Sequence, residues 1–289
     1  MKNKRKGILL AGGSGTRLYP VTKIFSKQLL PIYNKPMIYY PLSVLMLAGI
    51  NEILIITDEF NSSFFKKLLG DGSQYGLKLS YEVQSKPRGI AEALIIGDQF
   101  LNGSPVALIL GDNIFFGSHF SLMLNQASMS NKSTIFLYQV PDPHRFGVAE
   151  LSSKKQVIDI KEKPKTPKSS YAVTGLYFYD QKASDYAKKL KKSKRGELEI
   201  TDLNKIYIKK NRLVAQILGR GFSWYDTGTF NSLNDASNMI RNIEETQNLK
   251  IAFLLEIAFQ NKWIDKKELI YQSKSLSASD QKYVRSYLV

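Results

Sequence analysis

Short apolar runs alternate with helix-like patterns through the first half of the chain, and this rhythm restricts the fold more than any other feature. Residues 7–10, 53–57 and 106–110 are almost entirely apolar and too short for helices, whereas residues 61–69 and 89–100 have helical spacing. Strands that are apolar on both sides are typical of a parallel sheet covered by helices on both faces. We therefore expect an α/β fold whose ligand lies beyond the carboxyl ends of the strands.

The rhythm changes after Pro141. Residues 147–151, 156–161 and 171–179 are expected to be strands with no helix between them, which predicts that part of the sheet is antiparallel. The lysine-rich stretch 182–194 is expected to be an exposed helix.

Helical spacing dominates the end of the chain, from Phe230 onward. The sequence therefore predicts a Rossmann-like, mixed and mostly parallel sheet flanked by helices, with a helical C-terminal extension. We place the α/β domain at residues 1–229 and the extension at residues 230–289, packed on that domain or on a neighbouring subunit.

Composition excludes several classes of protein. With 289 residues, 43% of them hydrophobic, the chain can bury a sizeable core. It has no cysteine, which excludes disulfides, thiolate metal sites and a cysteine nucleophile, and suits a cytoplasmic protein. The apolar run at residues 37–50 contains Pro41 and is too short to span a membrane.

The chain is strongly basic, with 41 Lys and Arg against 25 Asp and Glu and a net charge of +16. Such a charge would suit a nucleic-acid binder. The basic residues are dispersed, however, over residues 2–6, 161–168, 188–195, 205–212 and 262–267. A solvated basic surface that attracts anionic nucleotides and sugar phosphates is the favoured interpretation, without nucleic acid or membrane as a partner.

A glycine-rich turn follows the first expected strand. Gly12, Gly13 and Gly15 let backbone N–H groups converge on one point, which suits a phosphate. The spacing matches neither the Rossmann nor the Walker fingerprint. Arg17 and Lys27 bracket the turn with two cations. Two cations beside such a turn indicate a triphosphate rather than an ordinary loop.

Two aspartates are candidate metal ligands. Asp112 directly follows the apolar run 106–110, and Asp226 lies in a glycine-containing stretch, 221–229. Either could instead be a turn or helix cap. If folding brings them together, they could hold Mg²⁺, which prefers hard oxygen ligands and keeps waters and phosphates around it.

Motifs spread through the chain resemble those of glucose-1-phosphate thymidylyltransferases, members of the sugar nucleotidyltransferase family with the nucleotide-diphospho-sugar transferase fold. The resemblance covers about residues 6–257. Its motifs, in family order, are residues 9–20, 26–31, 35–42, 69–73, 110–113, 162–164, 171–180 and 195–202.

The resemblance implies roles at matching positions. Arg17 would neutralise the leaving pyrophosphate and Lys27 would bind phosphate at the reacting centre, while Asp112 and Asp226 would carry Mg²⁺. The remaining nucleotide-binding positions would be Gly12, Gly13, Gln84 and Gly89.

The family also implies a sugar site and a regulatory site for a sugar nucleotide. The sugar-phosphate positions would be Gly147, Glu162, Lys163, Val173 and Tyr177. The regulatory positions would be His119, Gly219, Arg220, Glu256 and Ile257.

The chain departs from the usual family pattern at five positions. Arg88 replaces an acid and Glu92 replaces a glutamine beside the base-reading loop. Phe146 replaces a tyrosine near the sugar, and Phe115 and Gln260 replace a tyrosine and an arginine of the regulatory site.

We therefore expect a Mg²⁺-dependent homotetrameric enzyme that makes dTDP-glucose and pyrophosphate from dTTP and glucose 1-phosphate, for dTDP-rhamnose and polysaccharide synthesis. A sugar 1-phosphate is largely a dianion at neutral pH, with a second pKa of about 6, so it needs no general base. An enzyme that uses UTP or another hexose phosphate, a non-catalytic sugar-nucleotide sensor and a basic nucleic-acid binder remain alternatives. The set Arg17, Lys27, Asp112 and Asp226 argues against the sensor.

Overall fold

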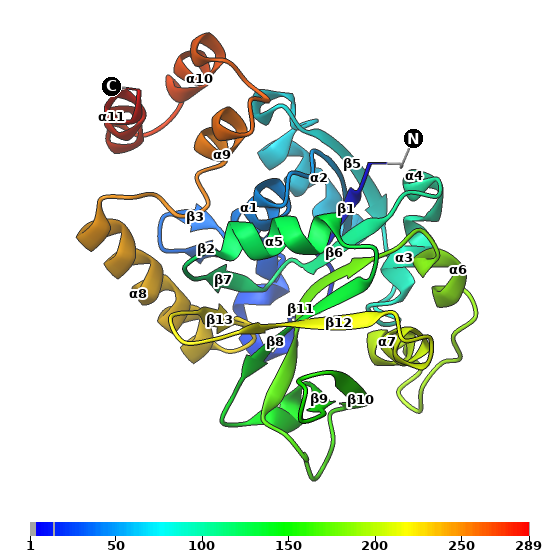
Figure 1. The fold of residues 1–289 in the computed structure, drawn as a ribbon. Helices are drawn as coiled ribbons and strands as arrows, with labels where there is room; N and C mark the ends of the chain where they lie inside the picture. The colour runs from blue at the N-terminus through cyan, green and yellow to red at the C-terminus, as the bar shows by residue number, and fades with distance from the viewer. Residues whose placement is uncertain (1–3, 14, 289) are drawn as a thin grey trace.

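The computed structural model describes residues 4–13 and 15–288, which form one nine-stranded sheet and the helices around it (Figure 1). Strand β1 (Lys6–Leu10) lies between β4 (Glu52–Thr57) and β6 (Val106–Leu110) and is parallel to both. Strand β5 (Lys78–Val83) adds a parallel edge beside β4. The chain thus crosses to opposite sides of β1, and open sheets bind their ligands at such a point.

The other half of the sheet is built on β11 (Tyr171–Tyr179), which runs antiparallel to β6. Strand β8 (Ser133–Gln139) pairs with β11, and β12 (Leu213–Leu218) pairs in parallel with β8. Strands β9 (Gly147–Leu151) and β10 (Val157–Glu162) form a hairpin beside the start of β11. The antiparallel pairing expected after Pro141 is therefore confirmed.

Two short ribbons lie outside the main sheet. Strands β2 (Pro31–Ile32) and β3 (Lys35–Pro36) form one antiparallel pair. Strands β7 (Ile114–Phe116) and β13 (Ser223–Tyr225) form the other. The second ribbon brings the segment around residue 226 back to the end of β6.

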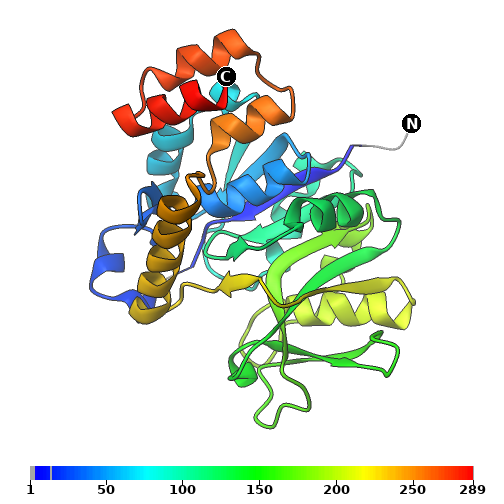
Figure 2. The same ribbon diagram turned by 60° about the vertical axis from the view of Figure 1, so that its left-hand side comes forward.

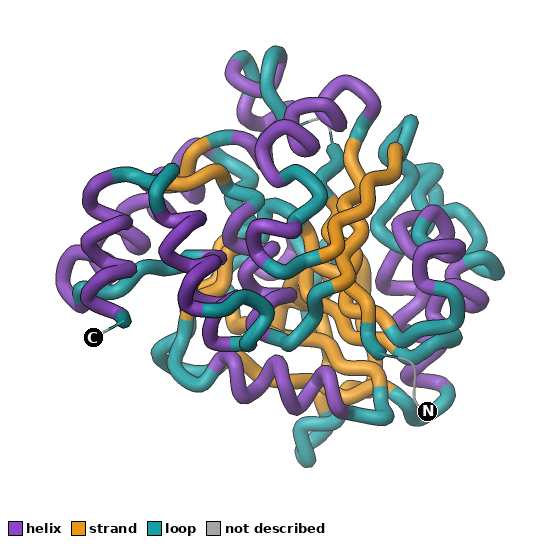
Figure 3. Tube along the Cα trace, turned by 90° about the horizontal axis from the view of Figure 1, so that it is seen from above, coloured by secondary structure: helices purple, strands orange, loops and turns teal. Residues whose placement is uncertain are grey.

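Helices cover both faces of the sheet, as Figure 3 shows from above. Leu9, Ile53 and Ile109 pack with α1 (Tyr39–Leu47), α2 (Glu59–Leu69) and α5 (Phe120–Met129). The alternate residues, such as Ile8, face α3 (Glu92–Ile96), α4 (Asp98–Leu101), α6 (Ala183–Ala187) and α7 (Ile200–Lys209). Because successive side chains of a strand point to opposite faces, strands buried on both sides read as unbroken apolar runs.

The described part of the chain ends in four helices, which lie along the left side and at the top of the α/β layers in Figure 2. They are α8 (Phe230–Gln247), α9 (Leu254–Gln260), α10 (Lys266–Ser273) and α11 (Ala278–Tyr287). Helix α8 lies against the β2–β3 ribbon, where the buried carboxylate of Glu244 accepts a bond of 2.9 Å from Lys35. A division of the chain at residue 229 stays a prediction.

Two helix predictions were wrong in extent. The lysine-rich stretch 182–194 forms helix only at α6, and its Ala183 and Ala187 are buried against the sheet rather than exposed. The stretch 89–100 splits into α3 and α4 at Gly97, whose ψ of 2° departs from the helical value, and only glycine fits there, since a Cβ would lie 2.6 Å from Ile8 Cδ1. No helix within the described ranges is long and apolar enough to cross a bilayer.

Candidate active site

The glycine turn follows the carboxyl end of β1, and the buried side chain of Gln28 supports it through a hydrogen bond. Gln28 donates from Nε2 to the Gly12 carbonyl at 3.2 Å and accepts a bond of 2.6 Å from Ser26 Oγ. Gly13 has a φ of 111° and Gly15 a φ of 56°, conformations that favour glycine. Ser14, in the middle of the predicted phosphate turn, lies outside the described residues.

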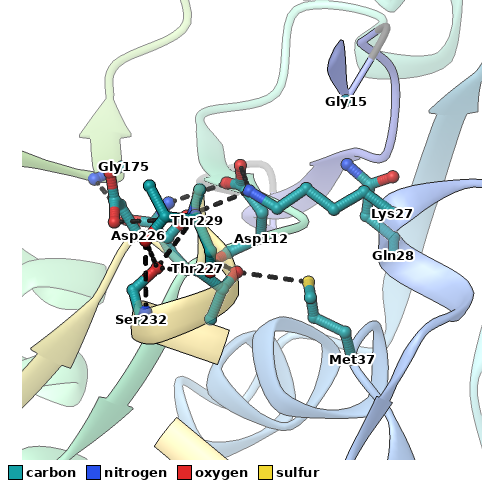
Figure 4. A network of polar contacts seen from close by, with 12 residues as sticks. Gly15, Lys27, Gln28, Met37, Asp112, Gly175, Asp226, Thr227, Thr229 and Ser232 are labelled. Atoms are coloured by element: carbon teal, nitrogen blue, oxygen red, sulfur yellow. Dashed lines mark hydrogen bonds and ion pairs between the residues drawn. The ribbon is translucent and has the colours of Figure 1, made fainter. Parts of the chain in front are cut away.

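Lys27 joins the two predicted metal ligands. Its side chain is 7% exposed, and Nζ donates to Asp112 Oδ2 at 2.7 Å and to the backbone carbonyl of Asp226 at 3.1 Å (Figure 4). Thr227 Oγ1 in turn donates to the Asp112 carbonyl at 2.6 Å. Two segments more than a hundred residues apart therefore meet at one buried ammonium group.

The remaining carboxylate oxygens also have partners. Arg145 donates to Asp226 Oδ2 at 2.9 Å, and Asn113 Nδ2 donates to Asp112 Oδ1 at 2.9 Å. Asn113 Oδ1 accepts from Gly175 N at 2.9 Å and from Trp224 Nε1 at 2.7 Å. Asn113 thus ties the end of β6 to the middle of β11 and to β13, and this buried network holds Asp112 in place.

Arg17 reaches the same centre from the other side of the glycine turn. A Cβ at Gly228 would lie 2.8 Å from Arg17 Nη2, so the guanidinium lies against the backbone just after Asp226. The Arg17 side chain is otherwise exposed. It lines the same cleft as Asp112 and Asp226, where its guanidinium can contact an anion.

Three clefts meet at Asp112. One of about 220 Å³ is lined by Gly12, Gly13, Gln84 and Gly89. A second of about 210 Å³ contains Gly12, Gly13, Arg17 and Lys27. The third, of about 490 Å³, contains the predicted sugar-site residues Gly147, Glu162, Lys163, Val173 and Tyr177, together with Arg17 and Asp226. The structure therefore brings together every residue predicted for the nucleotide, the phosphates, the metal and the sugar.

Comparison with known proteins agrees with this arrangement. Residues 6–243 match the family described as "Nucleotidyl transferase". A glucose-1-phosphate thymidylyltransferase of Neisseria meningitidis is 56% identical over 91% of this chain and 92% of its own length. One from Mycobacterium tuberculosis is 47% identical over 95% of both chains. The chain belongs to the glucose-1-phosphate thymidylyltransferase branch of the nucleotidyl transferase family.

Solved structures of related enzymes share the fold of this chain. A Bacillus anthracis protein described as a glucose-1-phosphate thymidylyltransferase, solved in complex with sucrose, has a TM-score of 0.76 and 44% identity, over 83% of this chain and 96% of that one. A UDP-glucose pyrophosphorylase solved with UDP-glucose has a TM-score of 0.72 and 25% identity, over 83% of this chain and 99% of that one. The predicted fold is confirmed.

The predicted nucleotide-binding end of the site rests on a close backbone approach. Gly89 has a φ of 104°, and a Cβ there would lie 2.3 Å from the Leu198 carbonyl oxygen. Leu198 N donates to the Arg88 carbonyl at 2.7 Å, and Ala91 N donates to the Leu198 carbonyl at 3.2 Å. Residues 88–91 are therefore held in a fixed position beside Gln84.

The predicted sugar-binding end is built around Glu162. Its Oε2 accepts a bond of 2.6 Å from Thr201 Oγ1 at the start of α7. A Cβ at Gly147 would lie 3.4 Å from the same oxygen, so the glycine leaves the carboxylate accessible. Burial, and secondarily the Glu162 charge, raises the pKa of Tyr177 well above its ordinary value, so this hydroxyl stays protonated. Lys163 is exposed at the rim of the cleft.

An irregular pairing in β11 shapes this pocket. Val173 pairs with Leu137 of β8, yet Tyr177 pairs with Ile135, so β11 carries two extra residues between them. Gly175 lies in this bulge, where a Cβ would be 2.7 Å from Leu110. Bulges are common beside binding sites, and this one lies between Val173 and Tyr177, which both line the same cleft.

The residues predicted for a regulatory site lie in two groups. His119 is exposed and directly precedes α5. It lies near the turn that contains Gly219 and Arg220, since the neighbouring Gly117 lies directly against Phe222. Glu256 and Ile257 are on α9. No polar contact joins these groups in the part of the chain that the structure describes. A regulatory role for them stays a prediction.

The donor set around Asp112 suits Mg²⁺ completed by a substrate. Nowhere in residues 4–13 and 15–288 do three acidic, histidine or cysteine side chains gather as a metal site. Mg²⁺ commonly takes one or two carboxylates and completes its shell with waters and phosphate oxygens. Asp112 and Asp226 lie in the same cleft and supply such hard oxygens, so the residues fit the ion.

Sequence reasoning missed several residues of this site. Arg145, Asn113, Gln28 and Thr201 each fix a predicted functional group by a hydrogen bond. Asn113 and Gln28 adjoin Asp112 and Lys27 in the sequence, which was the available signal. Arg145 and Thr201 are far from their partners along the chain, and no spacing rule connects them.

Proposed function

We propose that this protein catalyses Mg²⁺-dependent transfer of a thymidylyl group from dTTP to glucose 1-phosphate, forming dTDP-glucose and pyrophosphate. The observation that carries this proposal is the meeting of three clefts at Asp112, next to the Lys27 ammonium group. One cleft has room for a base, one for phosphates beside two cations, and one for a sugar phosphate. The names of the close relatives support the same reaction.

The chemistry requires positioning and charge neutralisation more than proton transfer. The sugar phosphate is largely a dianion at neutral pH and attacks the α-phosphorus in line, displacing pyrophosphate. Negative charge then changes most on the α-phosphate and on the leaving group. Preorganised cations that face those atoms stabilise the transition state more than the bound substrates.

Lys27 and Arg17 supply those cations in our proposal. Lys27 is buried and already held by Asp112, so it would meet the α-phosphate without reorganising. Arg17 would bind the pyrophosphate from the glycine turn with its forked donors. Asp112 and Asp226 would hold Mg²⁺, which supplies further positive charge to the phosphate oxygens. Arg145 would orient the Asp226 carboxylate.

We assign the larger cleft to glucose 1-phosphate. Glu162, oriented by Thr201, would accept hydrogen bonds from sugar hydroxyls, and the protonated Tyr177 hydroxyl would donate or accept one. Val173 and Gly147 would border the ring, and Lys163 would contact the sugar's phosphate. Gly12, Gly13, Gln84 and Gly89 would hold the nucleotide.

The wider assignment is that the product supplies dTDP-rhamnose and related polysaccharide sugars, and that the enzyme is a homotetramer. Exposed Ile24 and Phe25, beside the exposed Phe60, give an apolar surface that a second copy would cover. Sedimentation velocity tests the assembly. A UTP-using enzyme, one for another hexose phosphate, and a non-catalytic sensor are the rival functions.

A substrate matrix separates these functions. Pyrophosphate release is measured with dTTP, dUTP, UTP and dCTP, each against glucose 1-phosphate, galactose 1-phosphate and mannose 1-phosphate, with and without Mg²⁺. We expect the highest kcat/KM for dTTP with glucose 1-phosphate, and release only with the metal. Higher kcat/KM for UTP, or binding without turnover for every pair, would overturn the proposal.

A further inference from the structure

The amide of Gln84 has its nitrogen held by a carboxylate. Gln84 follows β5 and is 7% exposed. Its Nε2 donates to Glu92 Oε2, in the first turn of α3, at 2.6 Å. An ionised carboxylate only accepts hydrogen bonds, so the amide nitrogen must face Glu92. The two ends of the amide are therefore distinguished by Glu92.

The other end of the amide faces the nucleotide cleft. A Cβ at Gly12 would lie 3.3 Å from Gln84 Oε1, and both residues line the 220 Å³ cleft. Leu10, Ile90 and Leu110 supply apolar surface to the same cleft, as a base requires. With its nitrogen engaged, Gln84 presents a hydrogen-bond acceptor to whatever occupies this cleft.

We propose that Glu92 is a positioning residue that sets base specificity by fixing this amide. The inference rests on the proposed function, because it assigns the cleft to the base of the nucleotide. Thymine and uracil carry an N–H at N3, which an acceptor matches. Cytosine has an unprotonated ring nitrogen at that position, so two acceptors would face each other. Glu92 thereby selects imide bases over cytosine, without separating thymine from uracil.

The position of Glu92 is itself fixed. The close contact of Gly89 with Leu198, and the two backbone bonds beside it, hold the chain that leads into α3. The second oxygen of Glu92 lies 3.7 Å from Arg88 Nη1, whose side chain is 49% exposed. An exposed pair at that distance contributes little. The bond to Gln84 is therefore the contact through which Glu92 acts.

Two substitutions test the proposal. In Glu92→Ala the amide loses its partner, and in Glu92→Lys the new side chain can only donate, so it would turn the Gln84 amide over. The ratio of kcat/KM for dTTP to that for dCTP is measured with glucose 1-phosphate. Sites that hydrogen-bond a substrate group discriminate strongly against an analogue that lacks it. We expect the wild-type ratio to exceed about 100 and to fall at least tenfold in both variants.

The fall in kcat/KM for dTTP in these variants should appear mainly as a rise in KM, since base contacts form before the chemical step. Glu82→Gln, which removes an exposed carboxylate from the same strand end, is the matched control and should leave the ratio within twofold. A second probe is the triphosphate of N3-methylthymidine. It lacks the N3 donor, so Glu92→Ala should lower its kcat/KM much less than that of dTTP.

Equilibrium binding keeps this test separate from the proposed function. If the wild type released no pyrophosphate from any nucleotide, the function would fail, but the ratio of dissociation constants for dTTP and dCTP would still report on Glu92. Ratios within twofold of wild type in both folded variants, by kinetics and by binding, would overturn the inference. A merely structural role for Glu92 would weaken both nucleotides equally and overturn it too.

Discussion

Replacing Lys27 by methionine removes one half of a buried ion pair at the centre of the site. The lysine side chain is 7% exposed and that of Asp112 is 28% exposed, with 2.7 Å between Nζ and Oδ2. Removing one partner of a buried pair costs about 3–5 kcal/mol because a charge is left unpaired. Partial exposure of Asp112 places the expected loss of unfolding free energy at the lower end, about 3 kcal/mol. Loss of a preorganised charge contact should also lower kcat by about 10²–10³.

A second substitution separates stability from catalysis. Lys27→Met combined with Asp112→Asn removes both charges, so most of the unfolding free energy should return while kcat stays low. Urea unfolding and pyrophosphate release at saturating substrates measure the two quantities, with the exposed Lys23→Met as control. Recovery of kcat together with stability in the double variant, or a Lys27→Met kcat within threefold of wild type, would refute a catalytic role for Lys27.

Four further predictions follow from the site and its surroundings. Asp112→Asn and Asp226→Asn should each raise the Mg²⁺ concentration for half-maximal rate while retaining a folded circular dichroism spectrum; unchanged half-saturation in both would remove them from the metal site. dUTP should be used within about tenfold of dTTP in kcat/KM, because burying one methyl is worth only about 0.8 kcal/mol, and UTP should be poorer than dUTP; UTP equal to dTTP would favour a uridylyltransferase. Inhibition by a dTDP-sugar should be weak, because Gln260 offers no bidentate cation and its amide donates to Tyr287 and Glu256. Gln260→Arg should strengthen the inhibition, whereas strong wild-type inhibition that is noncompetitive with dTTP would show that other cations bind the inhibitor's diphosphate. Burial raises the pKa of Glu256, so its contribution to stability is greatest below about pH 4.5 and is lost as the pH rises through the raised pKa. The melting temperature of Glu256→Gln should therefore rise relative to that of wild type as the pH increases, and a pH-independent difference between the two would contradict this.

The sheet and its ligand edge could be predicted because the signals are local. Unbroken apolar runs correspond to β1, β4 and β6, whose residues are buried on both faces. Polar or glycine-rich turns at their carboxyl ends then had to share one edge. The glycine turn and Asp112, which follow two neighbouring parallel strands, are therefore predicted to lie together from the sequence alone.

Other features depend on contacts that the sequence does not display. The helical pattern breaks at Gly97, which packs against Ile8, and the lysine-rich stretch stops being helical after Ala187. The partnership of Arg145 with Asp226 depends on how two distant loops meet. Motif resemblance predicted the candidate ligands, whereas the hydrogen bonds that hold these residues depend on the folded chain.

The most direct test of the whole account is product analysis by ³¹P nuclear magnetic resonance. The protein is incubated with dTTP, glucose 1-phosphate and Mg²⁺, and the phosphorus signals are followed with time. We predict that dTDP-glucose and pyrophosphate form in equal amounts, and that neither forms when glucose 1-phosphate is left out. Formation of dTMP and pyrophosphate without the sugar phosphate, or an unchanged mixture with it, would contradict the account.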